Sequence, residues 1–132
     1  MSMTDTIGDF LTRIRNASGA KQRRITAPAS NMRLRVAEVL QRLNYLRSVD
    51  FVEDGKQGML VVKLRYTPDS KSVISGLERI SRPGLRVYFD RDKLSARSRK
   101  MGTVVLSTSR GLMTDKEAIE AGVGGEALFR VW

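Results

Sequence analysis

The pattern of apolar and polar residues near the N-terminus predicts two α-helices. In the first, four apolar side chains follow an i, i+3, i+4, i+7 spacing, namely Ile7, Phe10, Leu11 and Ile14. We expect Thr4 or Asp5 to cap this helix, which should stop near Gly19. The second helix is expected to open at Ser30 or Asn31. Its predicted buried face consists of Met32, Val36, Val39, Leu40 and Leu43.

Short apolar runs predict strands around these helices. One covers residues 25–27 and stops at Pro28, and a hairpin joins residues 48–53 to residues 59–66 through turns that contain Gly55 and Gly58. Two helices packed on this small sheet would form one α+β unit. Residues 67–71 have the composition of a linker.

The second half of the chain is predicted to be mostly β. Residues 72–81 fit either a helix or a strand, and the strand is favoured because residues 82–84 form a turn into a strand at 85–89. Residues 91–100 form a basic connector with room for one helical turn. Strands are expected at 102–107 and 127–131. Between them, the capping box of Thr114 and Glu117 opens a short helix that Gly122 closes.

These elements predict an α+β fold in two parts. Residues 1–66 would form an N-terminal domain of two helices and three strands, and residues 72–132 a mostly β C-terminal domain with one short helix. Residues 67–71 would link the two. A chain of 132 residues buries enough surface to fold without a disulfide or a metal ion.

Two residue types are missing from the composition, and their absence excludes several functions. The chain has no cysteine and no histidine, so thiol catalysis, thiolate zinc sites and histidine general bases are ruled out. The close carboxylate pairs of the second half are explained by the capping box and by neighbouring arginines. We therefore expect no catalytic residue, no metal and no cofactor. No apolar run approaches the roughly 20 residues of a membrane span and no signal peptide is evident, so a cytoplasmic protein is expected.

Positive charge is the strongest compositional signal. Lysine and arginine number 24 against 14 acidic residues, which gives a net charge of +10 and a sequence pI near 10.7. Over half of that excess lies between residues 82 and 110, where two aspartates oppose Arg82, Arg86, Arg91, Lys93, Arg97, Arg99, Lys100 and Arg110. A cluster of this kind is typical of a nucleic-acid contact.

Three features inside or beside this cluster are candidate RNA contacts. Ser107, Thr108, Ser109 and Arg110 leave a strand, and their hydroxyls, backbone N–H groups and guanidinium suit phosphate and 2′-hydroxyl oxygens, although an ordinary Ser/Thr turn fits them too. Gly124 and Gly125 allow close approach of a backbone. Glu126 would accept hydrogen bonds from base amino groups or 2′-hydroxyls.

Two further positions admit two interpretations each. Tyr88 suits base stacking and core packing equally. Arg13 and Arg15 lie in the last turn of the first helix, where cations suit the helix dipole as well as phosphate.

Several blocks of the sequence resemble the bacterial ribosomal protein S8 family of the small subunit. The longest covers residues 102–118, GTVVLSTSRGLMTDKEA. Residues 122–126 (GVGGE), 10–16 (FLTRIRN) and 81–88 (SRPGLRVY) match the same family in the right order. The resemblance runs from end to end, with a variable middle between about residues 48 and 75.

The resemblance implies a two-domain α+β protein that binds the central domain of 16S ribosomal RNA directly and early in assembly. Carried over by position, the contacts would come from Ser107, Thr108, Ser109 and the Gly124-Gly125-Glu126 turn. The N-terminal domain would touch a second RNA helix through Arg13, Arg15, Ser30 and Asn31. Ribosomal proteins S5 and S12 would be its protein neighbours, and the chain would be a monomer outside the ribosome.

Two other classes of function remain as alternatives. A DNA-binding regulator would need a recognition helix, for which Arg33, Arg35 and Arg42 on the second helix are the candidates. A hydrolase or nuclease is disfavoured by the missing histidine and cysteine.

Overall fold

The structure, a computed structural model, describes residues 5–97 and 102–132. The chain divides into two compact units: the N-terminal unit, Thr6–Ser75, and the C-terminal unit, Gly76–Trp132 together with Asp5. The expectation that Thr4 caps the first helix and the basic residues at 98–101 lie outside the described residues. The domain limits given above, 1–66 and 72–132 with a linker between them, stay a prediction.

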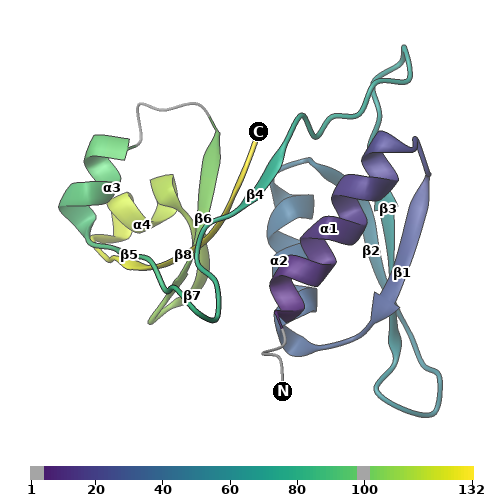
Figure 1. Cartoon of the computed structure of the whole chain (residues 1–132), viewed down its shortest axis with the longest axis horizontal. Coiled ribbons are helices and arrows are strands. Elements are labelled where there is room, and N and C mark those ends of the chain that lie inside the picture. The colour runs from purple at the N-terminus through teal and green to yellow at the C-terminus, as the bar shows by residue number, and fades with distance from the viewer. Residues whose placement is uncertain (1–4, 98–101) are drawn as a thin grey trace. The chain divides into compact units, whose positions relative to one another are not determined.

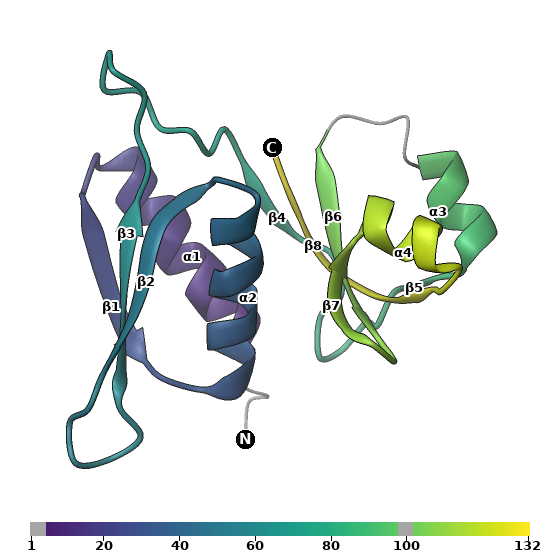
Figure 2. The same cartoon turned by 180° about the vertical axis from the view of Figure 1, so that it is seen from behind.

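Two helices cover one face of a three-stranded antiparallel sheet in the N-terminal unit (Figures 1 and 2). Its elements are α1 (Thr6–Gly19), β1 (Arg24–Pro28), α2 (Asn31–Arg42), β2 (Leu46–Val52) and β3 (Met59–Leu64), with strand order β1-β3-β2. The predicted apolar stripe of α1 is buried, and so are Val36, Val39 and Leu40 of α2. Ser30 is the N-cap of α2, where its side chain accepts a hydrogen bond from the backbone N–H of Arg33.

The C-terminal unit contains an antiparallel sheet with two short helices on one face. Its elements are β4 (Leu77–Arg79), β5 (Tyr88–Phe89), α3 (Arg91–Arg97), β6 (Thr103–Thr108), β7 (Gly111–Thr114), α4 (Asp115–Ala121) and β8 (Gly125–Val131). The strand order is β4-β8-β6-β7, and β5 also pairs with β8. Leu94 of α3 and Ala118 of α4 share a buried cluster with Leu106 and Ala127 of the sheet.

The α+β fold class is confirmed, and so are the capping box of α4 and its glycine stop. Three local predictions were incomplete. The strand expected at 85–89 is reduced to β5, because the N–H of Val87 donates to the Ser81 hydroxyl and not to a neighbouring strand. Residues 91–97 form the helix α3, and β7 was not predicted.

The segment between residues 66 and 81 combines a turn with a short strand. The backbone N–H of Thr67 donates to the carbonyl of Lys71, and an isolated bridge joins Tyr66 to Ser72. The favoured strand in residues 72–81 is present as β4. No helix of the described residues is long and apolar enough to cross a bilayer.

Candidate nucleic-acid interface

Three candidate residues that are distant in sequence lie in one row across the C-terminal sheet. The register of β8 places Glu126 opposite Tyr88 of β5 on one side and opposite Ser107 of β6 on the other. Directly opposed residues share a face of an antiparallel sheet. Their sequence neighbours Phe89 and Ala127 belong to the hydrophobic cluster of α3 and α4, so the row faces away from those helices.

We call Tyr88, Glu126 and Ser107 the cross-strand row. Tyr88 is 64% exposed, so its ring is open to solvent. Tyr88 is therefore not a core residue, and of the two interpretations that the sequence left open, core packing is excluded. Arg86, which is exposed two residues earlier, adds a cation at the same edge.

The carboxylate of Glu126 is held in a defined position by two donors. Its Oε2 accepts a hydrogen bond from the Ser81 hydroxyl at 2.6 Å. The same oxygen accepts a hydrogen bond from Arg86 at 3.0 Å and forms an ion pair with it. Burial raises the pKa of Glu126, but the hydrogen bonds from Ser81 and Arg86 and the charges of Arg86 and Arg79 outweigh it, so the pKa is lowered from its ordinary value. The hydrogen bond between Arg86 and Glu126 also raises the pKa of Arg86. Glu126 stays ionised at neutral pH, and its Oε1 has no protein partner among the described residues.

Replacement of Glu126 by glutamine should destabilise the protein more at neutral pH than at acid pH. Because the folded-state pKa is lowered, the carboxylate stabilises the fold above the unfolded value of about 4.3. This stabilisation is lost as the pH falls through the folded pKa. We expect Glu126→Gln to cost about 1–2 kcal/mol at pH 7 in urea unfolding and less at pH 3. The control is Glu120→Gln, an exposed position of α4; an equal cost at both pH values would contradict the network.

Ser109 and Arg110 form a two-residue turn between β6 and β7. Thr108 pairs with Gly111 across this turn, and Gly111 has a φ of 99°. The Thr108 hydroxyl donates to the carbonyl of Gly111 at 2.8 Å and accepts from the N–H of Arg110 at 3.0 Å. Thr108 thus fixes the shape of the turn, whereas Ser109 and Arg110 are exposed and available to a ligand.

Gly124 and Gly125 are required by contacts inside the protein. A Cβ at Gly124 would lie 2.4 Å from the carbonyl oxygen of Phe89, and a Cβ at Gly125 would lie 2.2 Å from that of Ser107. Backbone neighbours cannot yield as a flexible side chain can, so both positions exclude a larger residue. From the sequence we expected these glycines to allow close approach of RNA. In the structure they allow the chain at 124–125 to approach β5 and β6 closely.

The candidate residues of the N-terminal unit form a separate group. Arg13 forms an ion pair with Asp9 at 3.1 Å and donates to the carbonyl of Thr26. Asp9 also accepts from Arg33, whose N–H is capped by Ser30, so Arg13 and Ser30 belong to one network. Asn31 is exposed at the start of α2. Arg15 is two residues from Arg13 and points to another side of α1, because residues i and i+2 do not share a helix face.

Ser81 is a site residue that the sequence did not single out. It is fully buried, and its hydroxyl both donates to Glu126 and accepts from the N–H of Val87. Its position at the start of the SRPGLRVY block was the available signal. Within the described residues no group of carboxylates is arranged to hold a metal ion. The arrangement offers hydrogen bonds, cations and one aromatic face to a ligand.

Comparison with known proteins matches the whole described chain to one family. The family model described as Ribosomal protein S8 covers residues 5–132. A protein of Syntrophomonas wolfei named small ribosomal subunit protein uS8 is 47% identical over 132 residues, which is all of both chains. A protein of the same name from Streptococcus pneumoniae is 49% identical, again over the full length of both.

Proposed function

Because the chain belongs to the ribosomal protein S8 family, we propose that it binds the central domain of 16S ribosomal RNA directly. Through this binding it helps to organise assembly of the platform of the small subunit. Family membership itself makes the chain a structural, non-enzymatic constituent of the small ribosomal subunit, with ribosomal RNA and other ribosomal proteins as partners.

The cross-strand row is the observation that carries this proposal. It combines an exposed aromatic ring, an ionised carboxylate with one oxygen available, and a hydroxyl on adjacent strands. The guanidinium of Arg86 lies beside the row, and the β6–β7 turn presents Ser109 and Arg110. Sequence-specific proteins recognise irregular RNA by stacking unpaired bases on aromatic rings and by hydrogen bonds to base edges and 2′-hydroxyls. A sheet keeps these groups at fixed spacings, which suits one RNA shape.

Each group has a defined role in the proposed complex. Tyr88 stacks on an unpaired base, and the available oxygen of Glu126 accepts from a base amino group or a 2′-hydroxyl. Arg86 and Arg110 contact phosphates. Ser107 and Ser109 donate to the RNA, while Thr108, Gly124 and Gly125 keep the strands and the turn in position.

The N-terminal unit contributes a second contact in this proposal. Asn31 is exposed, and Ser30 and Arg13 lie in the Asp9 network. In the proposed complex these residues touch another RNA helix, and Arg15 contributes from another side of α1. Ribosomal proteins S5 and S12 are proposed as protein neighbours, and the chain as a monomer outside the ribosome.

Equilibrium binding to separate transcripts of the 5′, central and 3′ domains of 16S rRNA tests the proposal. We expect the central-domain transcript to bind at least a hundredfold more tightly than the others at 0.15 M salt, in keeping with specific recognition. The affinity should fall steeply with salt, because phosphate contacts release counterions. Equal affinity for all three transcripts, or for duplex DNA of the same length, would contradict it.

A further inference from the structure

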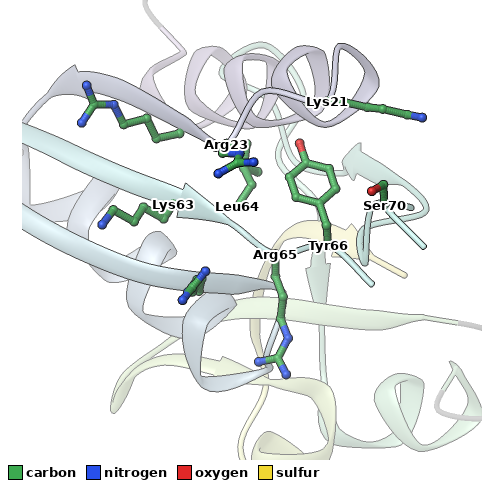
Figure 3. Close-up of a pocket in the computed structure, with 9 residues that line it drawn as sticks. Lys21, Arg23, Lys63, Leu64, Arg65, Tyr66 and Ser70 are labelled. Atoms are coloured by element: carbon green, nitrogen blue, oxygen red, sulfur yellow. The ribbon is translucent and has the colours of Figure 1, made fainter. Parts of the chain in front are cut away.

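A basic pocket lies in the N-terminal unit, at one end of its sheet (Figure 3). Its volume is about 930 Å³. The lining residues are Lys21, Arg23, Arg24, Arg47, Lys63, Leu64, Arg65, Tyr66 and Ser70. Six of these nine side chains are cations, and none is acidic. We call these nine residues the basic pocket.

The register of the sheet places like charges directly opposite each other in this pocket. Arg24 of β1 pairs with Lys63 of β3, and Arg65 follows Lys63 by two residues, which puts it on the same side of the chain. Like charges at opposed positions destabilise a sheet. The C-terminal sheet shows the favourable arrangement, with opposite charges at directly opposed positions. There Arg130 of β8 faces Glu78 of β4, and the two form an ion pair at 3.6 Å.

In the part of the chain that the structure describes, no carboxylate lies within ion-pair distance of the six cations. Among the described residues, none of the six forms an ion pair. The three strands of this sheet contain a single acidic residue, Asp50, and it does not line the pocket. All six cations are solvent-exposed. A destabilising arrangement without a structural partner marks a position kept for a ligand, and that ligand carries negative charge.

Tyr66 supplies an aromatic wall to the pocket, and its hydroxyl covers carbonyl groups near the C-terminal end of α1. Its hydroxyl donates to the carbonyl of Gln22, and the Ala17 carbonyl oxygen lies 3.5 Å from the same hydroxyl. The Ala17 carbonyl belongs to the last turn of α1, which is the negative end of the helix dipole and would repel an anion. Burial raises the pKa of Tyr66, so the hydroxyl stays protonated and continues to donate. Figure 3 shows the anchored ring among the basic side chains.

We propose that the basic pocket binds the phosphodiester backbone of an RNA segment. This surface is separate from the cross-strand row and from the Arg13 and Ser30 network, and it does not depend on which domain of 16S rRNA the chain recognises. RNA is favoured over an acidic protein segment because, among the described residues that line the pocket, Leu64 is the only aliphatic one and it is buried. Protein interfaces need an apolar centre, whereas nucleic-acid interfaces are polar and strongly positive.

Mapping of backbone amide shifts by NMR on the full chain tests this proposal, with a single-stranded oligouridylate as the probe. We expect saturable shifts at residues 21–24 and 63–66. The paired variant Arg24→Gln with Lys63→Gln should weaken the binding measured at these amides roughly tenfold and lower the slope of log affinity against log salt by about 1.4. The matched control, Arg35→Gln with Lys56→Gln, removes two exposed charges of the same unit outside the pocket. It should retain both the wild-type affinity and the wild-type salt slope.

A stability measurement separates a ligand site from a structural cluster. The paired pocket variant relieves repulsion between opposed cations, so its urea midpoint should equal or exceed that of the wild type. A lower midpoint, or shifts confined to residues 76–132, would overturn the proposal. Equal shifts at the pocket with polyglutamate at the same charge concentration would also overturn it, in favour of an acidic protein segment. The amide shifts report on the basic pocket alone. The result for the pocket can therefore be interpreted even if the central-domain transcript fails to bind preferentially.

Discussion

Gly125→Ala is expected to lower the free energy of unfolding of the protein by about 3 kcal/mol, the upper range for overpacked positions. The added Cβ would lie 2.2 Å from the carbonyl oxygen of Ser107, and its next neighbours are the Ser107 carbonyl carbon and the Thr108 methyl group. Relief would require β8 to move away from β6. That movement would break the Ser107–Glu126 pairing, which is part of the cross-strand row. Urea unfolding followed by circular dichroism measures the effect.

Gly84→Ala is the matched control for this experiment. Gly84 lies in the same unit, has no positive φ, and has no atom within 4 Å of an added Cβ, so its substitution should change stability by less than about 0.5 kcal/mol. If Gly125→Ala unfolded at the midpoint of the control and lost only RNA affinity, the glycine would serve approach of RNA, as the sequence alone suggested.

Tyr88→Ala is expected to reduce affinity for the central-domain transcript by about 1–3 kcal/mol, or roughly 5- to 150-fold, the range measured for one stacked base. The ring is 64% exposed, so its removal opens no cavity in the protein. The free energy of unfolding should therefore change by less than about 1 kcal/mol, the span of strand propensities. The combination of a large loss of affinity and a small change in stability is the signature of a contact with the ligand. Filter binding and urea unfolding on the same preparations provide both numbers.

Two controls make the Tyr88 result specific. Tyr88→Phe retains the ring and should retain most of the affinity. Phe51→Ala removes an aromatic side chain of β2 that is 54% exposed, lies in the N-terminal unit and is not part of the basic pocket. It should bind the transcript as the wild type does. If Phe51→Ala weakened binding as much as Tyr88→Ala, general loss of exposed aromatic surface would explain both.

The elements that depend on local sequence could be predicted. The apolar stripe of α1, the N-cap Ser30 and the capping box of Thr114 and Glu117 each act within one or two helical turns. Helical periodicity and capping therefore located both long helices and α4. The strand at 85–89 was predicted too long, since the Ser81 hydroxyl takes the Val87 N–H and apolar alternation does not reveal such a side-chain contact.

The candidate site needed information that the sequence does not carry. Tyr88, Ser107 and Glu126 were each candidates, but their common row depends on the pairing register of three strands. The buried partner Ser81 lies 45 residues from Glu126, so no spacing rule links them. The basic pocket also forms across distant segments, because Arg24 and Lys63 meet only when β1 pairs with β3. Charge counts located the cluster at 82–110 and overlooked this one.

Crosslinking of the wild-type protein to intact 16S rRNA, with identification of both the nucleotides and the peptides, tests the central claim most directly. We expect peptides that contain Tyr88 and the Ser109–Arg110 turn to be joined to nucleotides of the central domain. These crosslinks should weaken in Tyr88→Ala, while any crosslinks of the basic pocket should persist. Crosslinks from these two peptides to another domain of the rRNA, or a central-domain complex in which neither peptide is joined to RNA, would contradict the claim.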